Sequence, residues 1–168
     1  MSSSNLRIRR SVLDRLLAGS GDVPEGLVMT CTVEQLRDSV ARDLEALLNS
    51  RASFDFEDLA ATPNARDSVL TFGVRDFVGR VLSNGEDRRF ICASLARAIE
   101  THEPRLTHVR VNFNEKVNDR ARSINSLAFT IHAVLIVHPA KESASFDAVL
   151  QPSISRFALT AARFVPAG

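Results

Sequence analysis

The chain has 168 residues, of which 45% are hydrophobic, and its 21 basic residues nearly balance its 20 acidic residues to give a net charge of +1. This size is typical of one domain, and we predict a single domain over residues 1–168 with a flexible segment at residues 1–10. The balanced charge disfavours binding to nucleic acid, which a basic excess normally drives. No apolar run reaches the ~18 residues of a membrane helix, and the start of the chain has no apolar stretch typical of a signal peptide. We therefore expect a cytoplasmic protein without membrane insertion.

Residue usage narrows the functional classes further. Arg outnumbers Lys by 19 to 2. Arg is enriched and Lys depleted in interface cores, so the bias fits a subunit of an assembly, although codon usage explains it equally well. Trp and Tyr are absent, which disfavours an enzyme that acts on glycans, since carbohydrate clefts use these aromatics and their polar groups. The two cysteines, Cys31 and Cys92, are interpreted as small buried hydrophobic residues.

The first half of the chain has helical periodicity. Residues Ser11–Leu17 predict a short helix that ends near Gly19. Thr32 and Gln35 have the spacing of a capping box and predict the start of a longer helix. The apolar residues of that helix recur at three- and four-residue spacing and form one face; they are Val33, Leu36, Val40, Leu44, Leu47 and Leu48.

A long loop follows this helix. From Arg51 to Ala65 the periodicity is lost, and Pro63-Asn64 predicts a turn within the loop. Residues Ser68–Phe77 are apolar but are interrupted by Gly73, so they predict a short helical turn and a bend.

The last predicted helix begins at a second capping-box pattern, formed by Ser83 and Glu86. Pro104 disfavours helical geometry at the residue before it, so the helix is expected to end at Glu103. Its buried face is predicted to comprise Ile91, Leu95, Ala98, Ile99 and His102.

The second half changes to a period of two. Residues 109–113 alternate apolar and polar side chains and predict a half-buried strand. Residues Leu127–Val137 predict a longer strand with every second side chain facing the core, and His132 is predicted on the opposite face. The segment His138–Ser143 predicts the turn that follows.

Two more strands complete the pattern. Residues Ser145–Leu150 predict a third strand that ends before Pro152, because proline cannot donate to a β-ladder. Residues Arg156–Phe164 predict a final edge strand. N-terminal helices followed by a small antiparallel sheet of three to four strands predict the α+β class.

Motifs for catalysis, metals and cofactors are missing. No His occurs in an HExxH pattern or at zinc-ligand spacing with Cys, and the chain has neither a Gly-rich phosphate loop nor a GxSxG nucleophile elbow. Two carboxylate pairs, Glu100 with Glu103 and Glu86 with Asp87, are of the type that glycoside hydrolysis uses, but such pairs are mostly solvated or salt-bridged. The charged segment Glu115–Arg122 is interpreted as a solvated hairpin. We predict no catalytic residue, no metal site, no cofactor and no small-molecule substrate.

The sequence IETHEPRL is the feature that packing explains least. Pro104 ends a helix and Leu106 begins a strand, so Glu103 and Arg105 are held at a stiff corner between them. One hypothesis is that the corner makes a pre-ordered ionic contact with a partner, since little side-chain freedom remains to be lost. The alternative is an internal link between Glu103 and Arg105 that braces the corner.

Several segments together resemble the TssE subunit of bacterial type VI secretion baseplates. They are SVLDRLL, VARDLEALLNSR, SVLTFGVRDF, LAFTIHAVLIV, FDAVLQP and above all AIETHEPRLTHVRV, and they cover residues 11–152. TssE is grouped with the baseplate wedge proteins of contractile phage tails, which are often labelled lysozyme-like. The chain departs from the family pattern at His102, where an aromatic residue is common, and at Phe72, which replaces a more usual Tyr before Gly73.

The resemblance implies a non-enzymatic structural subunit of the type VI secretion baseplate. It implies that Glu103, Pro104 and Arg105 dock on the core of the wedge formed by TssF and TssG, and that the chain initiates assembly of the contractile sheath. It further implies that the region Leu127–Leu150 lends a strand edge to sheath subunits by β-augmentation. Two alternatives remain open at this point: a regulatory binding protein of the anti-adaptor type, and a peptidoglycan hydrolase.

Overall fold

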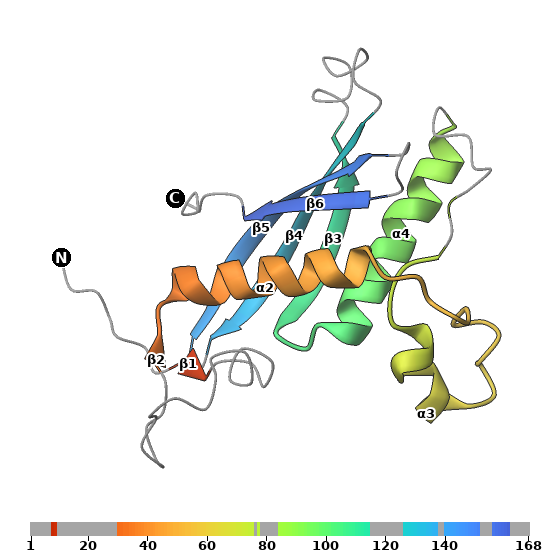
Figure 1. The fold of residues 1–168 in the computed structure, drawn as a ribbon, viewed down its shortest axis with the longest axis horizontal. Coiled ribbons are helices and arrows are strands. Elements are labelled where there is room, and N and C mark those ends of the chain that lie inside the picture. The colour runs from red at the N-terminus through yellow and green to blue at the C-terminus, as the bar shows by residue number, and fades with distance from the viewer. Residues whose placement is uncertain are drawn as a thin grey trace.

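The computed structural model describes residues 8–9, 30–75, 77, 84–114, 126–137, 140–151 and 156–161 (Figure 1). Two long helices cover one face of a four-stranded antiparallel sheet, which confirms the predicted α+β class. The predicted helix Ser11–Leu17 and the predicted hairpin Glu115–Arg122 lie outside the described residues. The elements are β1 (Ile8–Arg9), β2 (Thr30–Cys31), α2 (Val33–Leu48), α3 (Pro63–Arg66), a 3-10 turn (Val69–Thr71), α4 (Gly85–His102), β3 (Leu106–Phe113), β4 (Leu127–Val137), β5 (Ala140–Gln151) and β6 (Arg156–Ala161).

Helix α2 begins at the predicted capping box. The side chain of Thr32 accepts a hydrogen bond from the backbone N–H of Gln35, and the side chain of Gln35 accepts one from the backbone N–H of Thr32. These two bonds give acceptors to two backbone N–H groups at the helix start that have no partner within the helix. The buried side of the helix follows the predicted apolar face and comprises Leu36, Ser39, Val40, Ala41, Leu44, Leu47 and Leu48.

Helix α4 begins at a different cap from the predicted one. Its N-cap is Asn84, whose side chain accepts a hydrogen bond from the backbone N–H of Glu86 at 3.0 Å. The prediction of a Ser83–Glu86 capping box is therefore wrong about the N-cap, and Ser83 itself lies outside the described residues. Asn caps helices as well as Ser does, so the choice between adjacent candidates depended on where the chain enters the helix.

The other end of α4 agrees with the sequence. The helix ends at His102, and Glu103 is its C-cap, as the following proline predicts. The residues predicted for its inner face are buried, apart from His102, which is half-buried; the buried ones are Ile91, Leu95, Ala98 and Ile99.

The sheet has the strand order β3-β4-β5-β6, and every neighbouring pair is antiparallel. Pairing of β4 with β5 runs from Leu127 opposite Leu150 to Val137 opposite Ala140. The predicted turn over His138–Ser143 is therefore wrong from Ala140 onward, where the chain is already in β5. The polar run at the start of β5 concealed this strand, because backbone pairing with β4 does not require apolar side chains.

The segment between α2 and α4 consists mainly of turns. The turn predicted at Pro63-Asn64 is instead the start of the four-residue helix α3, whose first position suits Pro63 because its fixed φ matches a helix start. The predicted helical turn and bend are confirmed as the 3-10 turn and Gly73, which has φ +118°. A Cβ at Gly73 would lie 2.5 Å from the carbonyl oxygen of Ser50, so this close backbone approach requires glycine.

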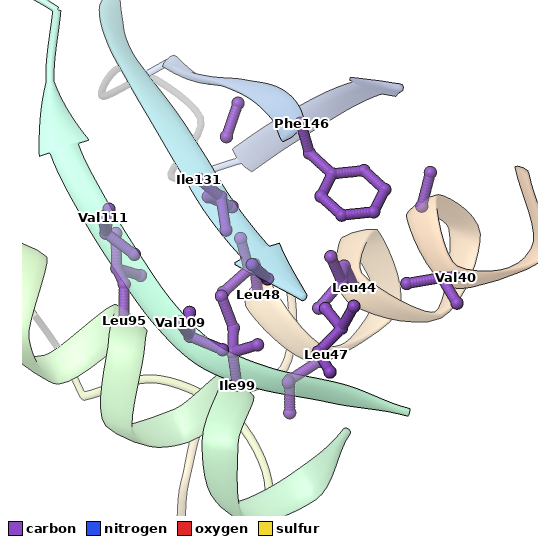
Figure 2. Close-up of a cluster of buried hydrophobic side chains, with 14 of the residues drawn as sticks. Val40, Leu44, Leu47, Leu48, Leu95, Ile99, Val109, Val111, Ile131 and Phe146 are labelled. Carbon is purple, nitrogen blue, oxygen red and sulfur yellow. The ribbon is translucent and has the colours of Figure 1, made fainter. Parts of the chain in front are cut away.

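The hydrophobic core lies between the two helices and the sheet (Figure 2). Leu44 and Leu48 of α2 point toward Ile131 and Phe146 of the sheet, and Ile99 of α4 contributes from the other side (Figure 2). Alternation along β4 is as predicted: the inward residues from Phe129 onward are buried and His132 is exposed. Since burial of each such side chain is worth about 1.5–3 kcal/mol, this layer fixes both helices on the sheet.

Candidate functional site

The Glu103-Pro104-Arg105 corner joins α4 to β3. The carboxylate of Glu103 turns back onto its own segment and accepts hydrogen bonds from the backbone N–H of Arg105 at 3.0 Å and from its Nε at 2.7 Å. Its second oxygen accepts a hydrogen bond from Nη2 of Arg105. The internal link between Glu103 and Arg105 is therefore present, and it holds the guanidinium by a bidentate contact along its Nε–Nη2 edge.

Helix α2 contributes two further groups to the corner. Nη2 of Arg105 pairs with the carboxylate of Asp43, and Nη1 donates to Oγ of Ser39 at 3.4 Å. Ser39 and Asp43 are one helical turn apart beside the buried stripe of α2. Sequence reasoning missed both, and their only local signal is a polar pair with i, i+4 spacing along the border of an apolar face.

The backbone also holds the corner rigid. The N–H of Leu106 donates to the carbonyl of Glu103 at 3.1 Å, and the N–H of Ile136 in β4 donates to the carbonyl of Arg105 at 2.8 Å. The second bond ties the corner to the end of the central hairpin. Side chains and backbone therefore fix the orientation of Arg105 before any partner arrives.

Electrostatics favour the charged form of Arg105. Burial opposes the charge, but hydrogen bonds and charge attraction from Glu103 and Asp43 outweigh it and raise the pKa of Arg105 further above its usual value. The cluster has two carboxylates and one guanidinium, so its formal charge is −1. The arrangement is suited to ionic recognition, because Arg105 stays positively charged at physiological pH.

Exposure shows which parts of the corner face the surroundings. The side chain of Glu103 is 6% exposed, whereas those of Arg105 and Asp43 are 21% and 27% exposed. Pro104 is exposed. A partner at this corner would therefore meet Pro104, Arg105 and Asp43, and Glu103 would lie behind them.

His102 connects the corner to the segment before α4. Its Nε2 lies 2.9 Å from the carbonyl oxygen of Thr71, and its ring packs edge-on against Phe72 with centroids 5.4 Å apart. The exposed large apolar side chains of the described residues all belong to this neighbouring segment, and they are Phe54, Val69, Leu70 and Phe72.

A family model described as baseplate wedge protein gp25 matches residues 34–140, which is well over half of the chain. The chain belongs to this family. TssE is the type VI secretion homologue of gp25, so the resemblance inferred from the sequence is confirmed. The matched range covers α2, α4, the corner and the first two strands of the sheet. No curated protein sequence matches the chain.

The sheet order limits which strands of this family member could meet a partner strand. The region Leu127–Leu150 was expected to lend an edge to partner strands. It forms β4, which lies between β3 and β5, and most of β5, which pairs with β6 only over Phe146–Gln151. The outer strands of the described sheet are β3 and β6, and β6 extends along only the second half of β5.

The other candidate chemical groups of this family member make contacts within the described part of the chain. Among the residues that the structure describes, no three His, Cys, Asp or Glu side chains gather as a metal site. Glu100, one of the candidate carboxylates, accepts a hydrogen bond from the backbone N–H of Val109 at 3.1 Å. Burial raises the pKa of the Cys92 thiol, an effect that a hydrogen bond from the backbone of Phe113 partly opposes. None of the helices in the described ranges is long and apolar enough to span a membrane.

Proposed function

We propose that the chain is a structural, non-enzymatic subunit of the type VI secretion baseplate in the cytoplasm. In this role it docks on a wedge core of TssF- and TssG-like proteins and initiates assembly of the contractile sheath. Membership of the baseplate wedge family supports the structural role. The observation that carries the docking part is the rigid Glu103-Pro104-Arg105 corner, whose guanidinium is held by two carboxylates and still reaches the surface.

The geometry gives the three residues of the motif different roles. Glu103 is buried and positions Arg105, so it acts on the partner through Arg105. Pro104 is exposed and shapes the turn, and it presents a stiff apolar surface beside the charged pair. Because the corner is already ordered, docking loses little conformational entropy. Ionic recognition and structural bracing are thus compatible roles for the same three residues.

Co-purification tests this proposal. The tagged chain would be co-expressed with the TssF- and TssG-like proteins of the same genome, either as wild type or with Pro104→Glu. We expect the wild type to co-elute with both partners and Pro104→Glu to reduce the retained partner at least tenfold. The reason is that a longer, charged side chain at an exposed turn obstructs the docking face without removing a buried contact.

A matched control separates docking from folding. Pro63 is exposed at the first position of α3, where Glu is well tolerated, so Pro63→Glu makes the same chemical change away from the corner. Both variants should retain the wild-type circular dichroism and melting temperature. Failure of the folded wild type to co-elute would contradict the proposed wedge docking, and equal losses in both variants would contradict docking through the corner.

A further inference from the structure

A cavity of about 160 Å³ lies between α4 and the segment that connects α2 to α4. None of the described residues that line it belongs to the Glu103-Pro104-Arg105 corner or to the sheet. Its apolar lining combines small residues, which leave the space, with three aromatic rings, which bound it; they include Gly73, Ala93, Ala98, Phe54, Phe56 and Phe90.

The charged residues around the cavity are paired with one another. Arg75 forms an ion pair with Asp55, and its Nη1 lies 3.6 Å from Oε2 of Glu57. Arg97 donates from Nη1 to Oε1 of Glu57 at 2.9 Å. These four groups carry two positive and two negative charges, so their formal sum is zero. A phosphate, carboxylate or ammonium group would gain an opposite charge here only by displacing an ion-pair partner, and the rim therefore favours an uncharged occupant.

The aromatic lining favours a ring over an aliphatic group. The guanidinium of Arg97 lies over the ring of Phe56 at 4.3 Å from its centroid, and that of Arg75 lies over the ring of Phe90 at 5.3 Å. Phe54 is 47% exposed, and within the described ranges its ring has no such cationic or aromatic neighbour. An uncovered ring at a cavity suits a second ring, because aromatic pairs are stabilised beyond the apolar area that they bury.

The volume of the cavity fits one aromatic side chain. An apolar cavity of roughly 150 Å³ engineered into another protein binds benzene. Pockets for drug-sized ligands are larger, at about 300–1,000 Å³, so this cavity is too small for a ligand such as a nucleotide. Aromatic side chains that fill pockets of this kind carry much of the binding energy of protein interfaces.

We propose that this cavity receives an aromatic side chain that a partner protein presents. The position of the cavity connects it to the proposed docking corner. The ring of Phe56 lies 6.4 Å from that of His102, which directly precedes the corner in the chain. A partner that docks at the corner can therefore cover both features, with an ionic contact at Arg105 and an apolar anchor in the cavity. The identity of this partner as a wedge protein rests on the proposed function.

The isolated chain tests ring binding without any wedge protein. The probes are N-acetylphenylalaninamide and N-acetylleucinamide, and binding is followed by NMR at the labelled methyl groups of Ala52 and Ala98, which both line the cavity. We expect saturable shifts with the phenylalanine probe and affinity at least about fivefold weaker for the leucine probe. Ala93→Leu, which fills the cavity from an exposed position of α4, should weaken binding of the phenylalanine probe at least about tenfold.

A matched variant separates filling of the cavity from any effect on the fold. Ala46→Leu makes the same change at an exposed position of α2, and it should bind the probes as the wild type does. Leucine is a good helix former, so both variants should keep the wild-type circular dichroism and melting temperature. Absence of saturable shifts in the wild type, or equal affinity of Ala93→Leu, would overturn the proposal. Equal affinity for the two probes would overturn the preference for a ring.

Co-purification with the TssF- and TssG-like proteins of the same genome then tests the partner. Folded Ala93→Leu should retain about fivefold less of these proteins than Ala46→Leu does, because its cavity no longer admits the anchor. Equal retention by the two variants would overturn the use of the cavity in wedge docking. Failure of the wild type to retain them would contradict the proposed function, whereas the probe measurements would still decide whether the cavity receives an aromatic ring.

Discussion

The two edges of one sheet are closed by different means. At β3, a backbone irregularity with a left-handed residue breaks the row of edge groups, and α4 adds one side-chain bond through Glu100. At β6 the strand is regular, and Asn49 and Glu45 of α2 provide the closure. The irregularity at β3 is part of the backbone conformation, whereas the side-chain hydrogen bonds at β6 can break and re-form by rotation of the side chains. The comparison therefore separates an edge protected by backbone geometry from one protected by the side chains of a packed helix.

The largest expected effect on stability comes from truncating a side chain of the core that supports both edges. Phe146 is fully buried and points toward α2 in Figure 2. Phe146→Ala should lower the free energy of unfolding by about 3–5 kcal/mol, because the cavity removes support from the helix that closes β6. Urea denaturation followed by circular dichroism measures this. Val149→Ala, a half-buried position in the same strand, is the control; a loss below about 1 kcal/mol for Phe146→Ala would contradict the packing described.

The corner joins α2 to the turn between α4 and β3, and breaking it should have the next largest effect on stability. Arg105→Ala leaves Glu103 nearly buried without its guanidinium and releases α2 from the α4–β3 turn. We expect a loss of about 2–3 kcal/mol, which is below the full value for a buried pair because Arg105 is partly exposed. Arg110→Ala, at an exposed position of β3, should change stability little. Equal effects of the two substitutions in chemical denaturation would contradict the bracing role.

A direct comparison of the two closures uses one substitution on each helix. Asn49→Ala removes two hydrogen bonds to β6 and should cost about 1–2 kcal/mol, whereas Glu100→Ala removes one bond to β3 and should cost about 1 kcal/mol. Equilibrium denaturation gives both values. Hydrogen exchange should show the Asn49 effect at β6 alone and the Glu100 effect at β3 alone. Spreading of either effect to the opposite edge would show that the closures are coupled.

A substitution at His108 tests how much strain the backbone irregularity of β3 carries. Its left-handed conformation is unfavourable for a residue with a Cβ, so His108→Gly should stabilise the protein by about 0.5–1 kcal/mol. His108 is exposed, so the substitution removes little packing. Thermal melts of this variant and of His132→Gly, an exposed histidine in regular strand geometry, make the comparison. Destabilisation of both variants to the same extent would show that the left-handed position carries no strain.

The smallest expected effect concerns the reactivity of the Cys92 thiol in α4. Burial raises the pKa of Cys92, so its reactive thiolate should be scarce at pH 8 and become abundant only above the usual thiol range of about 8–9. Alkylation by iodoacetamide, measured against pH in a Cys31→Ser background, should have its midpoint above that range. The same protein in urea provides the reference for an exposed thiol. A native midpoint at or below the urea value would contradict the burial of this side chain.

Local order could be predicted wherever its cause lies within a few residues. The Thr32–Gln35 capping box, the stop before Pro104 and the bend at Gly73 are examples, because caps, proline sterics and glycine backbones act on adjacent groups. Alternation also predicted the buried face of β4. The start of β5 could not be predicted in this way, because its polar residues become a strand through pairing with β4.

The sequence by itself therefore determined the fold class, the family and the corner of Glu103, Pro104 and Arg105. Only the tertiary structure decided what faces these elements. Asp43 meets Arg105 across 62 residues, and Asn49 meets Phe157 across 108. Such pairings follow from how helices pack on a sheet, and residue spacing along the chain carries no information about them. The strand order decided in the same way that β4 and β5 are inner strands and that β6 is an outer one.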